Sequence, residues 1–350
     1  MCTAITLTTK DHYFGRNLDL EYSYQETVTI TPRNYPFYFR KSFALTTHHA
    51  IIGMAYVKDD YPLYYDAMNE MGLSMAGLHF PDYACYLPEE QNKTNIAPFE
   101  FIPWILGKCS TVSEAKKLLE KTNLIKEPFS PELPLTPLHF IISDQKESIV
   151  VEPLAKGLKI YSNPIGILTN SPTFDMQLFE LNHYRNLSSG IPDNTFAPMM
   201  DLKAYSNGLG SQGLPGGWSS QSRFVKAAFV KTHSVCEPYE HSSVNQFFHL
   251  LSSVEHPRGC VEVKDRLYEI TVYSSCLNMD EGIYYYKTYD NSRITGIDMF
   301  LEDLEQNRLI SYPLLREESF SIQNQPVDEL IPPSFSSVSS PVSSSQTNIS

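Results

Sequence analysis

Apolar and polar side chains alternate along the first 60 residues of the chain, and this period of two predicts β-strands. Residues 2–9, which read CTAITLTT, show the pattern first. Two further strand-like runs occupy residues 61–81, on either side of a turn at Asn69–Gly72. The remaining early segments with this pattern are residues 12–19, 27–33 and 48–57.

Helical periodicity then occupies residues 98–121, where Thr111 and Glu114 form a capping box ahead of an apolar stripe. Strand patterns return in residues 138–144, 148–154, 158–162 and 165–170. Helical patterns follow near residues 175–187, 222–232 and 243–254. The final strand-like segments are residues 269–276, 282–289, 294–300 and 308–314.

Strands and helices therefore occur in separate blocks, which favours an α+β fold over a doubly wound parallel sheet. No Pro- and Gly-rich linker interrupts the middle of the chain, so we expect one domain over residues 2–325. From Pro332 the sequence is rich in serine and lacks apolar periodicity. We expect residues 326–350 to form a flexible tail.

The charge balance excludes one class of partner. The chain has 350 residues, with 27 Lys and Arg against 40 Asp and Glu, and a net charge of −13. Nucleic-acid binding needs a basic surface, so no nucleic-acid partner is expected. No apolar run approaches the roughly 20 residues of a membrane span, and the first residues lack a secretory signal pattern. We therefore expect a cytoplasmic protein with no membrane partner.

Two motif matches have a structural interpretation that we prefer. Residues Gly208 to Gly213 fit GxGxxG, but Leu-Pro-Gly-Gly follows them where a helix should begin, which favours a Gly-rich loop over a dinucleotide site. Ser113 and Lys116 fit SxxK, but they lie in the first turn of an amphipathic helix. The sequence has neither HExxH nor CxxC, so we expect no metal and no cofactor.

One of the six cysteines has a position with chemical meaning. Cys2 follows the initiator methionine, which is normally removed before a small residue, and its removal would make Cys2 the N-terminus. A free α-amine has an ordinary pKa of about 8, so it can accept a proton near neutral pH. An N-terminal cysteine thus combines a nucleophile with a base. The alternative is a chance cysteine on an edge strand.

The second strand adds a cation and a carboxylate to this position. Arg16 and Asp19 lie in FGRNLD, which could pair with the first strand as a hairpin. The guanidinium would favour the thiolate, and the carboxylate could orient the α-amine. A surface ion pair is the alternative for these two residues.

Five segments stand in an order that is typical of one family. They read MCTAITL, FGRNLD, DAMNEMGLSMAGLHFP, ILTNSPTFDMQL and LGSQGLPGGWSSQSRFVKAAF. Together they resemble the choloylglycine hydrolases, within the N-terminal nucleophile hydrolases, to about residue 325. The resemblance implies a four-layer αββα sandwich, with two antiparallel sheets between helical layers. It also implies that the chain cleaves a non-peptide amide bond. It further implies that the chain assembles as a homotetramer.

The resemblance also assigns the site. Cys2 corresponds to the nucleophile, the Asn170 amide to one oxyanion donor and the backbone N–H of His79 to the other. His79 departs from the family, which usually has Asn there. The implied catalytic residues are Cys2, Arg16, Asp19, His79, Asn170 and Arg223.

Two substrate branches exist in that family: conjugated bile salts and penicillin V. The segment AGLHFP looks nearer to the bile-salt branch, whose products would be a free bile acid and glycine or taurine. Penicillin V or an acyl-homoserine lactone is the alternative, with the same catalytic residues. The implied substrate-binding residues, each of which could instead simply pack in the core or on the surface, are Leu18, Tyr56, Tyr65, Phe129, Leu133 and Leu135.

Overall fold

Two antiparallel sheets contain most of the strands that the sequence predicts. A computed structural model describes residues 1–324, of which Met1–Glu317 form one compact unit. The first sheet has six strands, and its order is β12 (Ile167–Leu168), β1 (Cys2–Thr8), β2 (His12–Leu20), β15 (Ile270–Asn278), β16 (Ile283–Thr288) and β17 (Asn291–Asp298).

The second sheet has eight strands and is built mainly from the middle of the chain. Its order is β11 (Gly157–Ser162), β10 (Ser148–Leu154), β9 (Leu138–Ser143), β6 (Ser74–His79), β5 (Tyr61–Asn69), β4 (Ile51–Lys58), β3 (Thr27–Thr31) and β18 (Ile310–Pro313). Two small sheets pair β7 (Thr94–Ile96) with β8 (Thr122–Leu124) and β13 (Glu262–Lys264) with β14 (Leu267–Tyr268).

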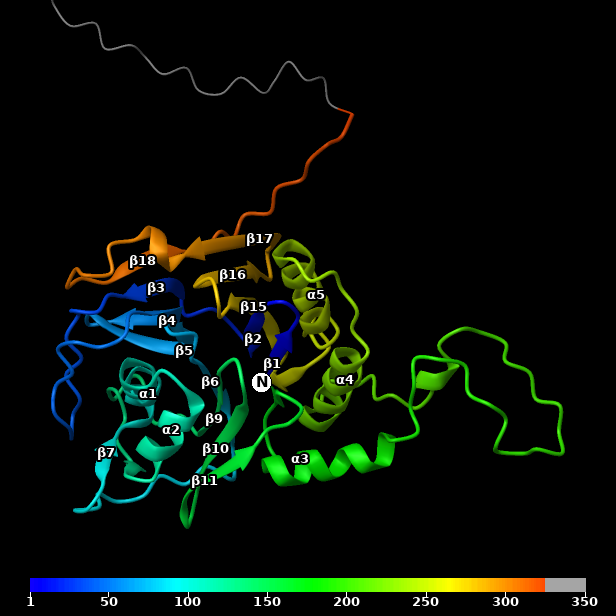
Figure 1. Ribbon diagram of the computed structural model, residues 1–350, viewed down its shortest axis with the longest axis horizontal. Coiled ribbons are helices and arrows are strands. Elements are labelled where there is room, and N and C mark those ends of the chain that lie inside the picture. Colours follow the sequence, from blue (N-terminus) through cyan, green and yellow to red (C-terminus); the bar gives the residue numbers. More distant parts are fainter. Residues whose placement is uncertain (325–350) are drawn as a thin grey trace, which may run out of the picture. The chain divides into compact units, whose positions relative to one another are not determined.

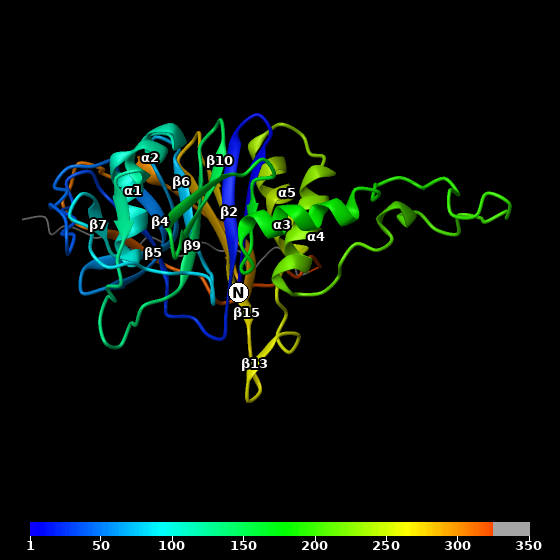
Figure 2. The same cartoon turned by 90° about the horizontal axis from the view of Figure 1, so that it is seen from below.

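Helices cover the outer face of each large sheet (Figures 1 and 2). α1 (Phe101–Lys108) and α2 (Val112–Leu119) lie on the side of the eight-stranded sheet. α3 (Phe174–Glu180), α4 (Ser220–Thr232) and α5 (Glu240–Ser252) lie on the side of the six-stranded sheet. The layer order is helix, sheet, sheet, helix, which confirms the predicted αββα sandwich.

Strand β2 shows how alternation divides chemistry between two layers. Arg16 faces the opposite sheet, where its Nη1 donates to the Gly77 carbonyl at 2.6 Å. Its neighbour Asn17 faces the helices, where its Nδ2 donates to the Leu251 carbonyl at 2.9 Å. Side chains at even positions of β2 therefore point between the sheets and those at odd positions point toward α5. Cys2 pairs with Leu18, so its side chain also points between the sheets.

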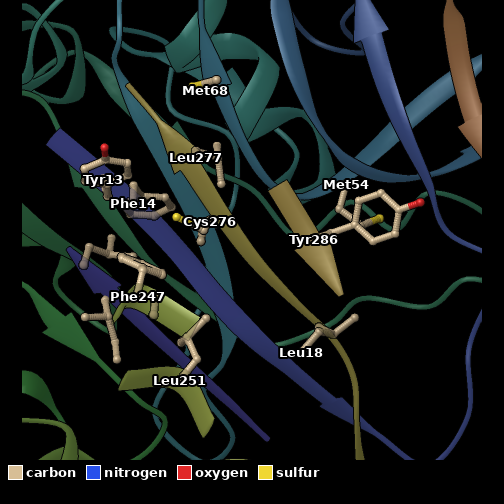
Figure 3. Close-up of a cluster of buried hydrophobic side chains, with 14 of the residues drawn as sticks. Tyr13, Phe14, Leu18, Met54, Met68, Phe247, Leu251, Cys276, Leu277 and Tyr286 are labelled. Atoms are coloured by element: carbon tan, nitrogen blue, oxygen red, sulfur yellow. The ribbon is translucent and has the colours of Figure 1, made fainter. Parts of the chain in front are cut away.

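The main core fills both of these spaces around β1 and β2. Figure 3 shows Phe14 and Leu18 of β2 with Met54 and Met68 of the eight-stranded sheet, and Phe247 of α5 nearby. All five side chains are almost fully buried. Each such burial stabilises the fold by about 1.5–3 kcal/mol relative to an exposed side chain. A second core lies between the eight-stranded sheet and α1.

Gly15 allows β2 to approach β15 closely beside the site. A Cβ at this position would lie 2.0 Å from the Ser275 carbonyl oxygen and 2.9 Å from a ring carbon of Phe247. Neither the strand backbone nor the buried ring has room to retreat. The glycine in FGRNLD is thus required by packing next to Arg16.

The structure differs from the sequence prediction at element boundaries. The helical region 98–121 is two helices, because Cys109 between them is extended, with φ −117° and ψ 139°. Thr111 caps α2 as predicted, because Glu114 N–H donates to Thr111 Oγ1 at 3.2 Å. The reciprocal half of the capping box differs: the Glu114 carboxylate accepts from Ser110 N–H at 2.7 Å instead of from Thr111 N–H. The segment 165–170 forms only the short strand β12, and Asn170 beyond it is free to turn its side chain toward β1.

Residues 185–219 project as a long irregular arm from the layer that contains α3 and α4 (Figure 1). It carries large apolar side chains that are exposed, among them Phe196 at 94%, Met199 at 85% and Tyr205 at 83%. The GxGxxG match lies in this arm, where Gly208 has φ +81° and a single 3-10 turn follows, rather than a phosphate-binding helix. The expected tail, 326–350, lies outside the described residues.

Candidate active site

Cys2 is buried at the start of β1, with only 3% of its surface exposed. Its backbone N–H donates to Asn170 Oδ1 at 2.9 Å, and its carbonyl accepts from Arg223 Nη1 at 2.5 Å. Both polar backbone groups of this residue are therefore bound by side chains from distant segments. The cysteine is held in place before any substrate arrives.

The Asn170 amide has a fixed orientation. Its oxygen accepts from Cys2 N–H and from Arg223 Nη2, the latter at 2.7 Å. Two donors on the oxygen leave the Nδ2 group on the other side, where it donates to the His79 carbonyl at 2.7 Å. The structure thus brings together Cys2, Asn170 and the His79 backbone, as a pair of oxyanion donors would require.

Arg223 connects three elements although it is fully buried. It projects from α4, and its Nη1 also donates to Thr3 Oγ1 at 2.6 Å, while its Nε donates to the Trp218 carbonyl at 3.0 Å. Burial lowers the pKa of Arg223, and the charges of Asp19 and Cys2 oppose that effect. The guanidinium stays charged in proteins, so it supplies a fixed positive charge beside Cys2.

Arg16 approaches from the space between the sheets. It is also fully buried, and its Nη1 donates to the carbonyls of Tyr65 and Gly77 at 2.9 and 2.6 Å. Burial opposes its charge, but the neighbouring Cys2, Tyr273 and Asp66 raise the pKa of Arg16. A retained cation on this side favours the thiolate form of a nearby sulfur.

Asp19 lies across from Met1 at the end of the same strand pair. The Asp19 N–H donates to the Met1 carbonyl at 2.9 Å, and the Met1 amine donates to the Asp19 carbonyl at 2.6 Å. The Asp19 carboxylate is fully buried and accepts from Thr271 Oγ1 at 2.6 Å. With Met1 attached, the Cys2 N–H contacts Asn170 rather than this carboxylate.

His79 places its backbone at the site and its imidazole at the surface. The residue ends β6 and is exposed, whereas its neighbours Leu78 and Phe80 are fully buried. Local desolvation and the N-terminal charge lower the pKa of His79. The contact of His79 with Asn170 is made by the backbone carbonyl and not by the imidazole.

An apolar cavity of about 350 Å³ opens next to the site, between β5, β6 and the loop before β9. It is lined by Gly77 and Leu20, which lie on the strands that carry His79 and Asp19. Five expected substrate-binding residues line it: Tyr56, Tyr65, Phe129, Leu133 and Leu135. Leu18 is not among the residues that line it, because it is packed in the core opposite Cys2. Leu20, the last residue of β2, lines the cavity instead.

Three residues around the site were not predicted from the sequence: Gln177, Ser220 and Thr271. Gln177 donates through Nε2 to the Asn170 carbonyl and, at 2.8 Å, to the Pro172 carbonyl. Ser220, the first residue of α4, accepts from Asn170 N–H at 2.9 Å. Gln177 lies in the segment TNSPTFDMQL, on the first turn of α3, so it could have been considered from the sequence alone. Thr271 lies in no such segment.

Residues 1–324 contain no group of three or more His, Cys, Asp or Glu side chains that could hold a metal ion. Over the same residues, no helix has both the length and the apolar character of a membrane span. Ser113 lies in α2 beside the Thr111 cap, where the neighbouring contacts are those of helix capping.

A cysteine at the start of an inner strand, in an αββα sandwich with a preorganised amide donor, defines the class of N-terminal nucleophile amidohydrolases. Comparison with known proteins narrows this class. The family model described as "Linear amide C-N hydrolases, choloylglycine hydrolase family" matches residues 2–312. The chain belongs to this family.

Individual relatives agree with this assignment. The chain is 54% identical over 324 residues to "Bile salt hydrolase/transferase" of Lactiplantibacillus plantarum, covering 93% of this chain and 100% of the relative. A crystal structure of a variant of conjugated bile acid hydrolase from Clostridium perfringens matches with a TM-score of 0.85 and 38% identity, covering 92% of this chain and 100% of that chain. Penicillin V acylase from Agrobacterium tumefaciens shares the fold, with a TM-score of 0.70 at 20% identity, covering 89% of this chain and 90% of that chain.

Proposed function

We propose that this chain hydrolyses the amide bond of glycine- or taurine-conjugated bile salts, with Cys2 as nucleophile. The proposal rests on the combination of two features. Cys2 is buried and its N–H donates to the Asn170 side-chain amide, and an apolar cavity lies at the ends of β2 and β6. The similarity to a bile salt hydrolase over the relative's full length supports the same substrate class.

The chemistry follows from the contacts around Cys2. After removal of Met1, the Cys2 α-amine accepts the thiol proton, and Sγ attacks the amide carbon. The oxyanion binds the Asn170 Nδ2–H and the His79 N–H, in place of the contact between Asn170 and the His79 carbonyl. The α-ammonium returns its proton to the leaving glycine or taurine, which leaves a thioester. Water then cleaves the thioester, and the α-amine again transfers the proton.

The charged residues have distinct parts in this scheme. Arg16 and Arg223 flank Cys2 from the two faces of β1 and β2 and stabilise the thiolate. Asp19 orients the new α-amine, since it lies directly across from Met1 in the strand pair. With a net charge of −13, the protein offers an anionic substrate no long-range attraction, so any binding of its charge is local.

The cavity suits a rigid apolar ring system. Its walls combine aromatic side chains, Tyr56, Tyr65 and Phe129, with the aliphatic Leu133 and Leu135. Sites of this kind bury most of a ligand through apolar contact and fix its orientation with few polar groups. A steroid plate in this cavity would direct its side-chain amide toward the ends of β2 and β6, where Cys2 is reached.

Penicillin V remains the alternative substrate with the same catalytic residues. Its support is weaker, since the match to a penicillin V acylase of Pectobacterium atrosepticum is 29% over 171 residues, or 47% of this chain. Parallel assays with glycocholate, taurocholate and penicillin V test the choice. We expect cleavage of the bile salts to be faster, and faster cleavage of penicillin V would reverse the assignment.

Nucleophile variants test the mechanism. Cys2→Ser should lose turnover, whereas Cys236→Ser, a matched change at a half-buried cysteine between α4 and α5, should keep it. Intact-mass analysis of the active protein should show that Met1 is absent. Turnover by a protein that retains Met1 would exclude the α-amine as base.

We further propose a cytoplasmic homotetramer in which each subunit is a single domain. All six cysteines are free, as expected in a reducing compartment. The exposed apolar side chains of the 185–219 arm, among them Phe196 and Met199, provide a surface for association. Light scattering should give four copies, and changing both side chains to serine should lower the oligomeric state.

A further inference from the structure

A buried histidine lies behind the site and takes no part in the mechanism above. His256 follows α5 and is fully buried, as is Asp19. Its Nε2 is 3.7 Å from Asp19 Oδ2, and its Nδ1 is 3.3 Å from Glu269 Oε2. The imidazole therefore lies between two carboxylates, one of which belongs to the proposed active site.

The atoms in this row depend on one another. Within residues 1–324, none of the four facing atoms, two carboxylate oxygens and two ring nitrogens, has a further hydrogen-bond partner. A neutral imidazole has one N–H and can donate to one carboxylate only, whereas an imidazolium has two. The separations of 3.3 and 3.7 Å are ion-pair distances, and only a protonated ring offers both buried carboxylates an opposite charge.

The main chain of His256 reinforces the same contact. Its N–H donates to Thr271 Oγ1 at 2.8 Å, and Thr271 Oγ1 donates to Asp19 Oδ1 at 2.6 Å. One oxygen of Asp19 is thus held through Thr271 and the other faces the ring. Both routes originate in His256, so this residue determines where the Asp19 carboxylate lies.

We propose that His256 is a positioning residue: as an imidazolium between Asp19 and Glu269, it fixes the Asp19 carboxylate and offsets its charge. This inference rests on the proposed function, in which the Cys2 α-amine is the base. An anionic Asp19 alone would hold that amine as an ammonium, which cannot accept a proton. The imidazolium weakens this hold, and Asp19 still orients the amine.

The charges around the ring are of both signs. The amine of Met1 donates to Glu269 Oε1 at 2.8 Å. The negative charges of Asp19 and Glu269 both act to raise the pKa of Arg223, against the lowering effect of burial. Burial raises the pKa of Glu269, but the hydrogen bond from His256 and the N-terminal amine outweigh it and lower the pKa. The other charged groups near the cluster are Arg16, on the far side of Asp19, and Lys226, Glu255 and Lys287, which line a cavity with His256.

His256→Gln tests the proposal because glutamine keeps a donor but no charge. For glycocholate we expect kcat at neutral pH to fall by about five- to tenfold, with KM within about twofold. The acid limb of the pH–rate profile should move up by about one unit, because the amine is then held more tightly as ammonium. A profile that superposes on that of the unchanged enzyme would overturn the proposal.

His48→Gln is the matched control. His48 is also buried and has two polar contacts, to the His49 and Tyr35 carbonyls at 2.6 and 2.8 Å, but it lies against the second core. It should leave the profile unchanged. A shift of equal size in the control would overturn a specific role for His256.

Chemical rescue separates charge from packing. The cavity of about 420 Å³ that borders His256 and Thr271 gives a small molecule access to a His256→Ala variant. Imidazole, which is protonated near neutral pH, should restore turnover, and pyrazole, which has the same shape and stays neutral, should not. Equal effects of the two azoles, including no effect of either, would overturn the proposal.

Cys2 alkylation keeps this test independent of the substrate. The rate of reaction with iodoacetamide, followed by mass spectrometry of the N-terminal peptide, should show the same pH shift in His256→Gln. If the unchanged enzyme cleaved no bile salt while the alkylation profiles still differed, the proposed function would fail and the role of His256 would stand. Identical alkylation profiles would overturn the role itself.

Discussion

Replacing Asn170 separates two tasks that one amide performs. Its Nδ2 is the proposed oxyanion donor, and its oxygen accepts from Cys2 N–H and Arg223 Nη2 at 2.9 and 2.7 Å. Asn170→Ala removes both tasks. Asn170→Asp keeps an acceptor oxygen for the same two donors, but it loses the N–H donor and places its second oxygen against the His79 carbonyl.

The expected magnitudes differ between kinetics and stability. Loss of one oxyanion donor costs about 2.7–4 kcal/mol of barrier, so both variants should lose about 100- to 1,000-fold in kcat. Asn170→Ala also leaves two buried donors without an acceptor, at about 1–3 kcal/mol each in the free energy of unfolding. Asn170→Asp avoids that loss, because its carboxylate faces the Arg223 guanidinium.

Two measurements check this reasoning. Steady-state release of glycine from glycocholate gives kcat and KM, and thermal unfolding followed by circular dichroism gives stability. We expect the two variants to be equally slow, with Asn170→Asp clearly the more stable. Asn170→Asp with kcat within tenfold of the unchanged enzyme would refute the donor role, and equal stabilities would refute the acceptor role.

Three further outcomes are expected. Gly15→Ala should lower the free energy of unfolding by about 1–3 kcal/mol in denaturant titrations, because its Cβ meets the Ser275 carbonyl at 2.0 Å; an unchanged midpoint would contradict this packing. The lowered pKa of Glu269 contributes stability that is present above its ordinary value and is lost as pH falls through the folded value, so Glu269→Gln should weaken the acid dependence of unfolding. Phe129→Ala should raise KM for glycocholate more than it lowers kcat, and the reverse split would remove Phe129 from substrate binding.

The periodic and well separated strand and helix blocks predicted an α+β fold, and the resemblance of five segments to the choloylglycine hydrolases implied its four layers. The sequence prediction missed the break at Cys109, where the apolar pattern continues although the backbone becomes extended. It also extended a strand to Asn170, whose side chain leaves the sheet to contact Cys2. Boundaries of this kind depend on tertiary contacts, which local periodicity does not contain.

The candidate site was predictable where its residues lie in distinctive local segments. Cys2, Arg16 and Asn170 meet in the structure as those segments suggest. His256 was not predictable, because it reaches Asp19 only through the pairing of β2 with β15, and no spacing in the sequence encodes that register. Leu18 shows the converse limit: alternation gives its face, but its depth below Cys2 comes from the packing of both sheets.

The nucleophile belongs to the backbone ladder of a sheet and not to a loop. Cys2 pairs with Leu18 on one side, and on the other the Asn170 side chain takes the place of a missing strand partner. Catalytic geometry and global folding are therefore parts of one cooperative equilibrium. Heating should abolish activity and native structure at a single midpoint, and the half-life of the enzyme at high temperature should equal the half-life of its fold.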